Sequence, residues 1–551
     1  MEQWRLILAI VLSIFVFLLW EFLFATHPDP TTPVTDKPAE TQQFSDQTET
    51  SVQKSQPLPL DGSGQSESGQ SFQSVTVKSS LYTARISEKG AAITSFVLQK
   101  YREEVGKNSP LKEMLPGDNP NGTALVHMGG ADPDQWFNAP FKTDYAGDTL
   151  TVNDTEQSIS FFWDTPQGLV IEKRYTFIPE SYLVRLKVFV KNPSERAVED
   201  QLILTMQNQV PEERSRFAFE GPFAYINGEL EEIDVDDIPE KPQYSGRIEW
   251  AGLSDRYFMT TAMPHAVETV RLSLAHNPDT EMVAVNLAHP SRKISANMQD
   301  VFQFSLYLGP KRMSILRQHD NNLAKAINFG FFDVIAKPCL WLMNYLHDHF
   351  IPNWGVAIIL LTILFKLIFW PLGSKSYRSM AEMKKLQPLM SDIRKKYKDD
   401  KKKMNEEVMR LYKTYKVNPM SGCLPMVAQI PVFIAFYRML YEAIELRHAP
   451  FILWINDLSA PDRLFHFDVT IPLMLPPYGI PVLTIIMGAT MFLQQKLSPP
   501  PGDPSQAKFM MMMPLIFTFI FINFPSGLVL YWLVNNVISI AQQYYITKKI
   551  V

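Results

Sequence analysis

Apolar positions in the last third of the chain gather into five long segments separated by polar stretches. The segments cover residues 353–372, 422–441, 478–493, 509–524 and 527–545. A helix of about 20 apolar residues crosses the hydrocarbon core of a bilayer, so each segment predicts a membrane span. Two segments have only 16 residues, or roughly 24 Å of helix, which predicts a locally thinned bilayer.

A sixth apolar run lies near the start of the chain, where residues 6–20 are apolar except for Ser13. No small-residue cleavage site and no lipoprotein cysteine follow it. Residues 1–26 are therefore predicted to be an uncleaved membrane anchor rather than a removed signal peptide. Residues 27–71 are rich in Pro, Thr, Ser and Gln and poor in large apolar side chains, which predicts a disordered linker.

Short β-branched and aromatic runs replace the long apolar segments in residues 72–328. Examples are Leu81–Ser87, Leu169–Ile178 and Tyr182–Val190, which alternate in part and are separated by turn residues. This pattern predicts a large all-β sandwich or barrel, long enough to bury a core of its own. No convincing pair of carboxylates and no nucleophile–base set stand out within it.

Residues 329–352 form a shorter amphipathic stretch. Asp333, Lys337, Asn344 and Asp348 recur at helical spacing, and large apolar residues fill the other positions. The pattern predicts a helix lying in the membrane interface, interrupted by Pro338. The alternative is a buried helix that belongs to the β domain.

Charge is divided unevenly along the 551 residues, although the whole chain has a net charge of only −5. Residues 1–330 carry 29 basic and 43 acidic residues, whereas residues 331–551 carry 23 basic and 14 acidic ones. Within the second part, residues 373–420 hold 14 basic and six acidic residues. The positive-inside rule places this loop and both termini in the cytoplasm and the β domain on the opposite side.

Several classes of site are excluded by composition and motif. Cys339 and Cys423 are the only two cysteines, which excludes a disulfide scaffold and a cysteine-based metal centre and predicts free thiols. No phosphate-binding loop and no H-E-x-x-H motif occur. His347 and His349 are two residues apart on a predicted helix and therefore lie on different faces. We expect no metal, no cofactor, no catalytic residue and no nucleic-acid specificity.

Lys366 is the candidate functional residue, because it lies inside the apolar segment 353–372. A charge at the bilayer centre costs about 2.5–3.5 kcal/mol on insertion scales. The last three predicted spans contain no Asp or Glu, and Glu442 and Glu445 lie at the far end of the span 422–441. Lys366 is therefore predicted to face a wet cavity open to the cytoplasm, unless it reaches the interface by snorkelling.

Polar side chains within the other spans are candidate partners in this cavity. They are Thr362, Gln429, Gln494 and Gln495, followed by a stripe of Asn535/Asn536, Ser539 and Gln542/Gln543 that Tyr531 and Trp532 precede. Taken singly, such residues are as well explained by hydrogen bonds between packed helices. Taken together with an unpaired lysine, they favour a polar groove.

The cytoplasmic loop predicts a helical hairpin over residues 375–416, joined near Lys398–Lys403. Apolar stripes on its two halves would pack against each other. Lys384, Lys385, Arg394, Lys395 and Lys396 would give its outer face a positive charge. Anionic lipid, a ribosome or an acidic partner would suit this face, and a merely solvated surface is the alternative.

Several short strings in residues 330–550 together resemble the YidC family of membrane protein insertases of the Gram-negative type. The strings are Asn353-Trp354-Gly355, Lys366 followed by Pro371-Leu372, Leu386-Gln387-Pro388, Val417-Asn418-Pro419, Gly422-Cys423, Gln429-Ile430-Pro431, Ala449-Pro450-Phe451, Trp454-Ile455, Asp457-Leu458-Ser459 and Phe524-Pro525-Ser526-Gly527-Leu528. The resemblance implies a polytopic α-helical inner-membrane protein of six spans, with a five-helix core (353–551) and a periplasmic β-supersandwich.

The resemblance also implies a function without covalent chemistry. Newly made membrane proteins would enter a positively charged groove open to the cytoplasm, alone or together with the Sec translocon. Lys366 would supply the charge, and Thr362 and Trp532 would line the substrate path. The ribosome, the signal recognition particle machinery and the phospholipid bilayer are the further partners implied.

The sequence departs from the family pattern in two respects, and two rival functions are considered. Lysine stands at position 366 where many members have arginine, which keeps the charge but loses the planar fork. The tail ends at Val551, so a ribosome contact through a long basic tail is not expected. A secondary transporter would need an intramembrane carboxylate relay or inverted repeats. A membrane-anchored periplasmic carbohydrate-binding protein would need a cleft with suitable polar groups.

Overall fold

The computed structural model describes residues 72–550, apart from residues 107, 116–118, 120, 212–217, 266–269, 399, 416, 418–423 and 498–503. The expected anchor (1–26), linker (27–71) and Cys423 therefore lie outside the described residues. All of the described residues belong to a single compact unit.

The first described part is built from β-sheets. A nine-stranded sheet has the order β14 (Glu229–Glu232), β13 (Gly221–Ile226), β16 (Ile248–Ser254), β17 (Phe258–Pro264), β21 (Met298–Pro310), β10 (Leu183–Asn192), β9 (Val170–Phe177), β8 (Gln157–Asp164) and β6 (Lys142–Thr143). One five-stranded sheet has the order β4 (Leu111–Glu113), β3 (Ala92–Arg102), β2 (Tyr82–Ser87), β1 (Ser74–Lys78) and β7 (Thr149–Thr151). Another has the order β15 (Gln243–Tyr244), β18 (Arg271–Asn277), β19 (Met282–Ala288), β12 (Leu202–Gln209) and β5 (Leu125–Met128), and β11 (Val198–Asp200) pairs with β20 (Arg292–Ile294).

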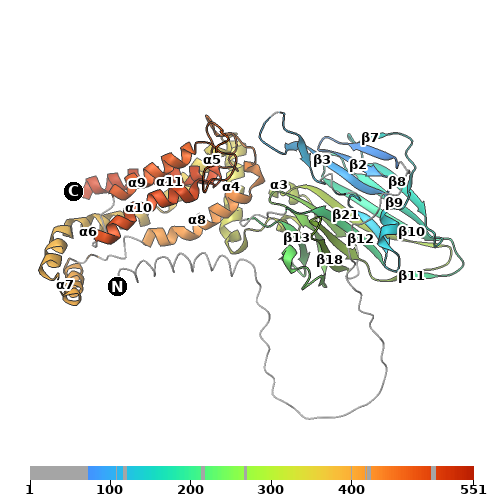
Figure 1. The fold of residues 1–551 in the computed structure, drawn as a ribbon, viewed down its shortest axis with the longest axis horizontal. Helices are drawn as coiled ribbons and strands as arrows, with labels where there is room; N and C mark the ends of the chain where they lie inside the picture. Colours follow the sequence, from blue (N-terminus) through green and yellow to red (C-terminus); the bar gives the residue numbers. More distant parts are fainter. Residues whose placement is uncertain are drawn as a thin grey trace, which may run out of the picture. The chain divides into compact units, whose positions relative to one another are not determined.

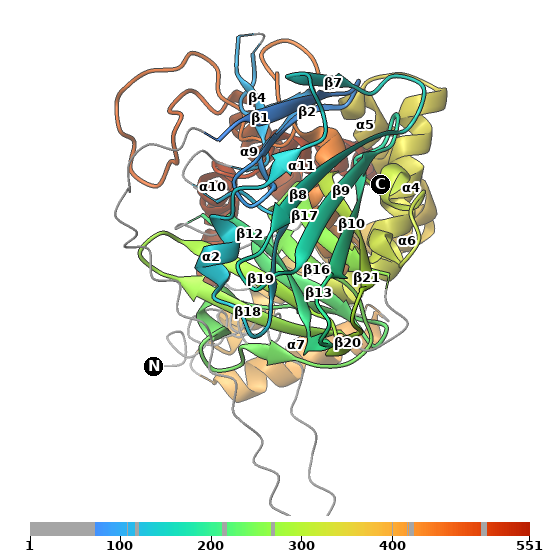
Figure 2. The ribbon, with the colours of Figure 1, turned by 90° about the vertical axis from the view of Figure 1, so that its right-hand side faces the viewer.

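Alternation along the central strands explains why they form a sheet with a buried face. In β10, every second residue from Val184 to Val190 is buried, and β10 pairs in antiparallel register with both β9 and β21 (Figure 2). Alternating burial of this kind is what a strand with one face on a core requires. The all-β prediction for this part of the chain is confirmed.

Lys173 is an exception to the apolar rule in this core. It occupies an inward position of β9 and is completely buried. Its ammonium group donates hydrogen bonds to the carbonyl oxygens of Gly90 (3.0 Å), Ala91 (2.8 Å) and Ala124 (2.8 Å). Burial holds the pKa of Lys173 well below its usual value. The three carbonyl contacts compensate for the cost of removing this polar group from water.

Helix α4 (Asp333–His349) covers the amphipathic stretch, but its polar stripe does not simply face solvent. Lys337 bonds with Asp333, and Asn344 donates to Glu445 (3.4 Å). The exposed surface of α4 includes apolar side chains, among them Trp341, which is 57% exposed. Exposed aromatic residues on one helix are typical of a helix that lies against a membrane or a partner.

The rest of the described chain is helical. After α4 come α5 (Trp354–Ile368), α6 (Trp370–Lys396), α7 (Lys401–Thr414), α8 (Leu424–Glu442), α9 (Val482–Leu497), α10 (Pro504–Phe521) and α11 (Ser526–Ile550). Helix α11 packs against α5, α6, α8 and α9, and α10 packs against α9 (Figure 1). This arrangement makes α11 the central helix of the group.

The apolar segment 353–372 is divided between two helices. Helix α5 ends at Ile368, and α6 begins at Trp370 after a bend of 64°. Pro371 lies in the first turn of α6, where its missing N–H is tolerated, whereas inside a longer α5 it would break a hydrogen bond. Of the described helices, only this bent pair meets the length and hydropathy expected of a span, while Val482–Leu497 and Lys508–Phe521 are shorter apolar helices.

Candidate functional site

Lys366 lies in the last turn of α5, two residues before the helix ends. Its side chain is half-buried, and among the described residues no carboxylate lies within ion-pair distance of it. The C-terminal end of a helix dipole favours a cation, which partly stabilises the charge. The ammonium group therefore stays close to the helix break with no described counter-ion.

Thr362 is one helical turn before Lys366 but is not open to solvent. The residue is 2% exposed, and its hydroxyl donates to the carbonyl oxygen of Ile358 (2.7 Å). Such a bond back to the preceding turn satisfies the hydroxyl within its own helix. In this conformation Thr362 offers a substrate little beyond its methyl group.

The polar stripe on α11 connects that helix to its neighbours. Gln429 of α8 donates to Asn535 (3.0 Å), and Gln429 also hydrogen-bonds with Tyr531. Asn536 donates to Thr490 of α9 (3.4 Å). These bonds join α11 to α8 and α9, as expected of polar residues on packed helices, and bring Gln429, Asn535 and Tyr531 together as one cluster.

Further along α11, the same stripe reaches α6. Tyr377 hydrogen-bonds with Ser539 and with Gln494 of α9. Gln542 donates to the carbonyl oxygen of Trp370 (3.1 Å) and to the hydroxyl of Ser374 (3.2 Å). Tyr377 and Thr490 were missed by the sequence reading, because single hydroxyl residues in a helix give no signal of their own.

Trp532 and Tyr531 belong to an aromatic cluster beside the polar stripe. Trp532 packs edge-on against Phe433 of α8 (4.7 Å between ring centroids) and against Phe521 of α10 (4.9 Å). Tyr531 stacks on Phe436 at 4.8 Å. The cluster joins α8, α10 and α11 and gives the polar residues an apolar boundary.

The basic residues of the hairpin lie apart from this cluster. Lys384, Lys385, Lys395 and Lys396 are exposed, and Arg394 is half-buried. On the opposite side of α6, Leu386 and Met390 are buried, and Tyr412 of α7 donates to the sulfur of Met390 (3.5 Å). The hairpin therefore has an apolar seam and a cationic outer surface.

The end of the helical region opposite the hairpin is closed by the segment 443–481, and we call it the loop end. Asn353 caps α5 through the amide of Val356 (3.1 Å) and donates to the carbonyl oxygen of Phe451 (3.1 Å). A Cβ on Gly355 would lie 2.1 Å from the Phe451 ring. Glycine is thus required where α5 meets the loop.

Further bonds at the loop end tie the loop to itself and to α9 and α11. The carboxylate of Asp457 accepts from the amide of Ser459 (2.7 Å) and the amide of His448 (3.0 Å), and the hydroxyl of Ser526 donates to the Asp457 carbonyl oxygen (2.7 Å). Asp462 accepts from the amide of Leu483 (2.7 Å) at the start of α9. These residues bring together strings that are far apart in the sequence.

The β part contacts this end directly. The guanidinium of Arg256 donates to the carbonyl oxygen of Tyr441 (2.8 Å) near the end of α8 and lies 3.7 Å from the Tyr441 ring centroid. Within the described residues, no group of three His, Cys, Asp or Glu side chains is placed to hold a metal ion.

Two family models and many relatives match the chain. Residues 74–342 match the YidC periplasmic domain, and residues 345–551 match the 60Kd inner membrane protein family. Membrane protein insertase YidC of Syntrophobacter fumaroxidans is 40% identical over 99% of both chains, and that of Syntrophus aciditrophicus is 39% identical over 99% of both. That of Nitratidesulfovibrio vulgaris strain Hildenborough is 36% identical over 100% of both.

Solved structures overlap the chain only loosely. A crystal structure of an active YidC insertase covers 87% of this chain and 93% of its own, at 20% identity and a TM-score of 0.38. A galactose mutarotase related enzyme from Lactobacillus acidophilus covers 43% of this chain and 97% of its own, at 12% identity and a TM-score of 0.33. Overlaps at these TM-scores carry no conclusion about function.

Proposed function

We propose a mechanism for this chain, which belongs to the YidC family of membrane protein insertases, in which Lys366 attracts the hydrophilic segment of a substrate. The chain is an inner membrane protein with a periplasmic domain, and its activity is membrane protein insertion rather than enzymatic catalysis. Its substrates are membrane proteins. The proposal concerns which residues receive them.

The observation that carries the proposal is the state of Lys366. Its charge lies in the last turn of an apolar helix with no carboxylate within ion-pair distance among the described residues. In low dielectric an unpaired cation attracts an acidic segment far more strongly than in water. A membrane potential that is positive outside helps acidic residues across by about 2.3 kcal/mol per charge per 100 mV.

The cluster around Asn535 extends this site. Gln429 of α8 bonds with Asn535 and Tyr531 of α11, and Gln494 of α9 bonds with Tyr377 of α6. Such bonds can be exchanged for bonds to a passing polar backbone at little net cost. Trp532 then borders the path, which the buried Thr362 would join only when the helices around it separate. Polar packing alone would give the same bonds, so the test must report on substrate contact.

The apolar segment of the substrate then moves along α8 and α10 into lipid. Exposed apolar side chains support this route, since Ile430 of α8 and Met511, Leu515 and Phe519 of α10 all face outward. Methionine adapts to many apolar partners. A surface of this kind would accept substrates of different sequence.

We place six spans in the inner membrane, with the hairpin and both termini in the cytoplasm. The charge of residues 373–420, with 14 basic and six acidic residues, supports this orientation. The Sec translocon would cooperate on large substrates, and the cationic face of the hairpin would meet the ribosome, the signal recognition particle machinery or anionic lipid.

Charge reversal at Lys366 tests the proposal. Lys366→Glu should reduce insertion of a small protein with an acidic N-terminal tail at least tenfold, because like charges repel in low dielectric. Lys366→Arg should keep most of the activity. Protease protection in inverted membrane vesicles measures insertion, and photo-crosslinking from positions 366, 362 and 532 to a ribosome-bound nascent chain measures contact.

Lys496→Glu is the matched control, because Lys496 also lies in the last turn of a helix but is exposed. We expect normal insertion from it. Full activity of Lys366→Glu, at a normal level of the protein in the membrane, would refute the role of Lys366.

A further inference from the structure

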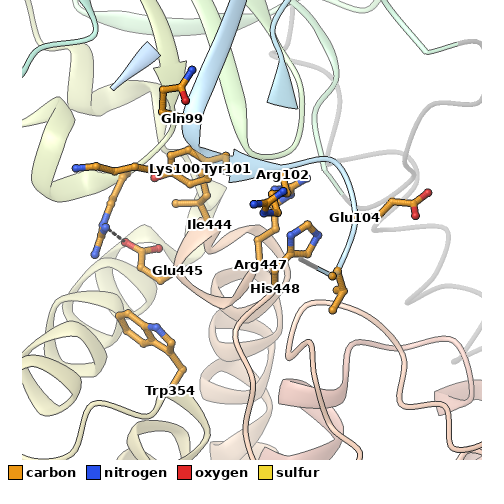
Figure 3. A pocket seen from close by; sticks show the side chains of 13 residues that line it. Gln99, Lys100, Tyr101, Arg102, Glu104, Trp354, Ile444, Glu445, Arg447 and His448 are labelled. Atoms are coloured by element: carbon orange, nitrogen blue, oxygen red, sulfur yellow. Dashed lines mark ion pairs between the residues drawn. The ribbon is translucent and has the colours of Figure 1, made fainter. Parts of the chain in front are cut away.

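A cavity of about 470 Å³ lies where the end of β3 and the loop after it meet the segment that follows α8 (Figure 3). It is separate from Lys366 and from the cluster of Gln429, Asn535 and Tyr531, and none of these residues lines it. Its volume falls within the range of small-ligand sites. The residues that line the cavity indicate the chemistry of the ligand that would fit it.

The lining is cationic. Lys100, Arg102, Arg312 and Arg447 line the cavity, against the carboxylates of Glu104 and Glu445. The Glu445 side chain is only 1% exposed and faces Arg312, with 3.9 Å between Oε1 and Nε (Figure 3). Burial raises the pKa of Glu445. Arg312 is thus paired with Glu445. Among the lining residues, Lys100, Arg102 and Arg447 then have Glu104 as the one other carboxylate.

Two of the three arginines in this lining, Arg102 and Arg447, are held in place with N–H donors to spare. Arg447 donates one hydrogen bond to the carbonyl oxygen of Glu103 (3.0 Å), and its guanidinium lies 5.2 Å from the Phe258 ring centroid. Arg102 donates to the carbonyl oxygen of Ser109 (2.5 Å). A guanidinium has five N–H donors, and its planar fork suits a phosphate oxygen pair.

Two buried polar atoms beside the cavity have no described hydrogen-bond partner. They are Nε of Arg312 and Oδ1 of Asn344. His448 adds a neutral donor to the lining, because burial and the neighbouring Arg447 lower the pKa of its ring. An anion in the cavity would thus meet the unused N–H of Arg312 and the His448 ring as well as positive charge, whereas the Asn344 oxygen is an acceptor and offers an anion nothing.

Trp354 indicates where such an anion comes from. It lines the cavity, stacks on His347 at 3.8 Å, and is the first residue of the apolar helix α5. Tryptophan is enriched at the level of lipid headgroups. Trp341 on the neighbouring α4 and Phe350 just after that helix are exposed. A phosphate at this level of the protein belongs to a lipid headgroup rather than to free solute.

We infer that this cavity binds the phosphodiester headgroup of an anionic phospholipid, with Arg102 and Arg447 as its ligands and Lys100 adding positive charge on the other side of the lining (Figure 3). The inference rests on the proposed function only in placing the start of α5 at the membrane surface. A bound headgroup would join β3 of the periplasmic domain to the segment after α8. It would also be a specific lipid site separate from the substrate path.

Calorimetric titration of the full-length protein in dodecyl maltoside tests this site. Dioctanoyl phosphatidylglycerol should bind at least tenfold more tightly than dioctanoyl phosphatidylcholine or glycerol 3-phosphate. Arg102→Gln combined with Arg447→Gln should weaken phosphatidylglycerol binding about tenfold. Lys100→Gln, on an exposed side chain, should weaken it severalfold without affecting folding.

Arg185→Gln is the control, because this arginine lies on β10 and pairs with the exposed Glu156. It should bind phosphatidylglycerol normally. Lys366→Glu should also bind normally even when it fails to insert substrates, which separates this site from the groove. Unchanged affinity in the Lys100 and Arg102/Arg447 variants would overturn the inference. Equal binding of phosphatidylcholine, equal binding of glycerol 3-phosphate, or tighter binding of a Glu-rich decapeptide would overturn it too.

Discussion

The loop end and the hairpin end of the helical region are held by different kinds of bond. At the loop end, side chains satisfy backbone groups, as when Arg463 donates to the carbonyl oxygens of Ile522 (2.9 Å) and Pro477 (3.1 Å). Towards the hairpin end, the bonds between helices join mainly amide and hydroxyl side chains to one another, as between Gln429 and Asn535 (3.0 Å) and between Asn536 and Thr490 (3.4 Å).

This difference in bonding indicates which end of the helical region can rearrange. A backbone group that loses a buried partner costs about 1–3 kcal/mol, so the loop end resists rearrangement. Side chains that bond to each other between helices contribute about 0.6 kcal/mol on average in membranes and can change partners. This contrast is what the proposed groove requires, because such a groove must stay closed at the loop end and adapt towards the hairpin.

The same substitution at a glycine near each end gives the largest expected contrast. Gly355→Ala places a Cβ 2.1 Å from the Phe451 ring, whereas Gly373→Ala meets only the flexible end of Gln542 at 3.1 Å. Overpacking of this kind costs roughly 1–3 kcal/mol. We expect a clearly lower unfolding temperature in detergent for Gly355→Ala and a small change for Gly373→Ala. Equal effects would contradict the contrast.

The next effect in size concerns Asp457. Asp457→Ala removes the acceptor of the amides of His448 and Ser459, which should cost about 2 kcal/mol. The unfolding temperature of the purified protein measures this loss. Asp468→Ala, on an exposed residue of the same loop, is the control and should have no effect. A stable Asp457→Ala protein would show that the loop end is not held as described.

The sequence predicted the architecture better than the contacts at either end. The division into a β part and a helical part follows from side-chain periodicity, and the structure and the family matches confirm it. The number of spans, the domain boundaries and the roles of the groove residues stay predictions. The periodicity of apolar residues indicates which face of a helix or strand is buried, but it does not show where a helix bends.

Particular residues show why the rest was missed. Lys173 breaks the apolar pattern of β9, yet it is buried because three carbonyl groups from distant segments converge on it. The polar stripe of α4 predicted a helix in the membrane interface and named no partner for it, yet Asn344 bonds to Glu445, which lies 101 residues further along the chain. Such partners depend on tertiary structure and leave no local signal in the sequence.

The smallest expected effect lies within the polar cluster itself. Gln429→Leu and Asn535→Leu each remove one side of a 3.0 Å bond between α8 and α11. Their coupling energy in a double-mutant cycle should be about 0.6 kcal/mol, measured by thermal unfolding in detergent. Such a weak bond can break each time a substrate passes. A coupling energy of 2 kcal/mol or more would show that this contact fixes the two helices together, and the cluster would then be packing rather than a groove.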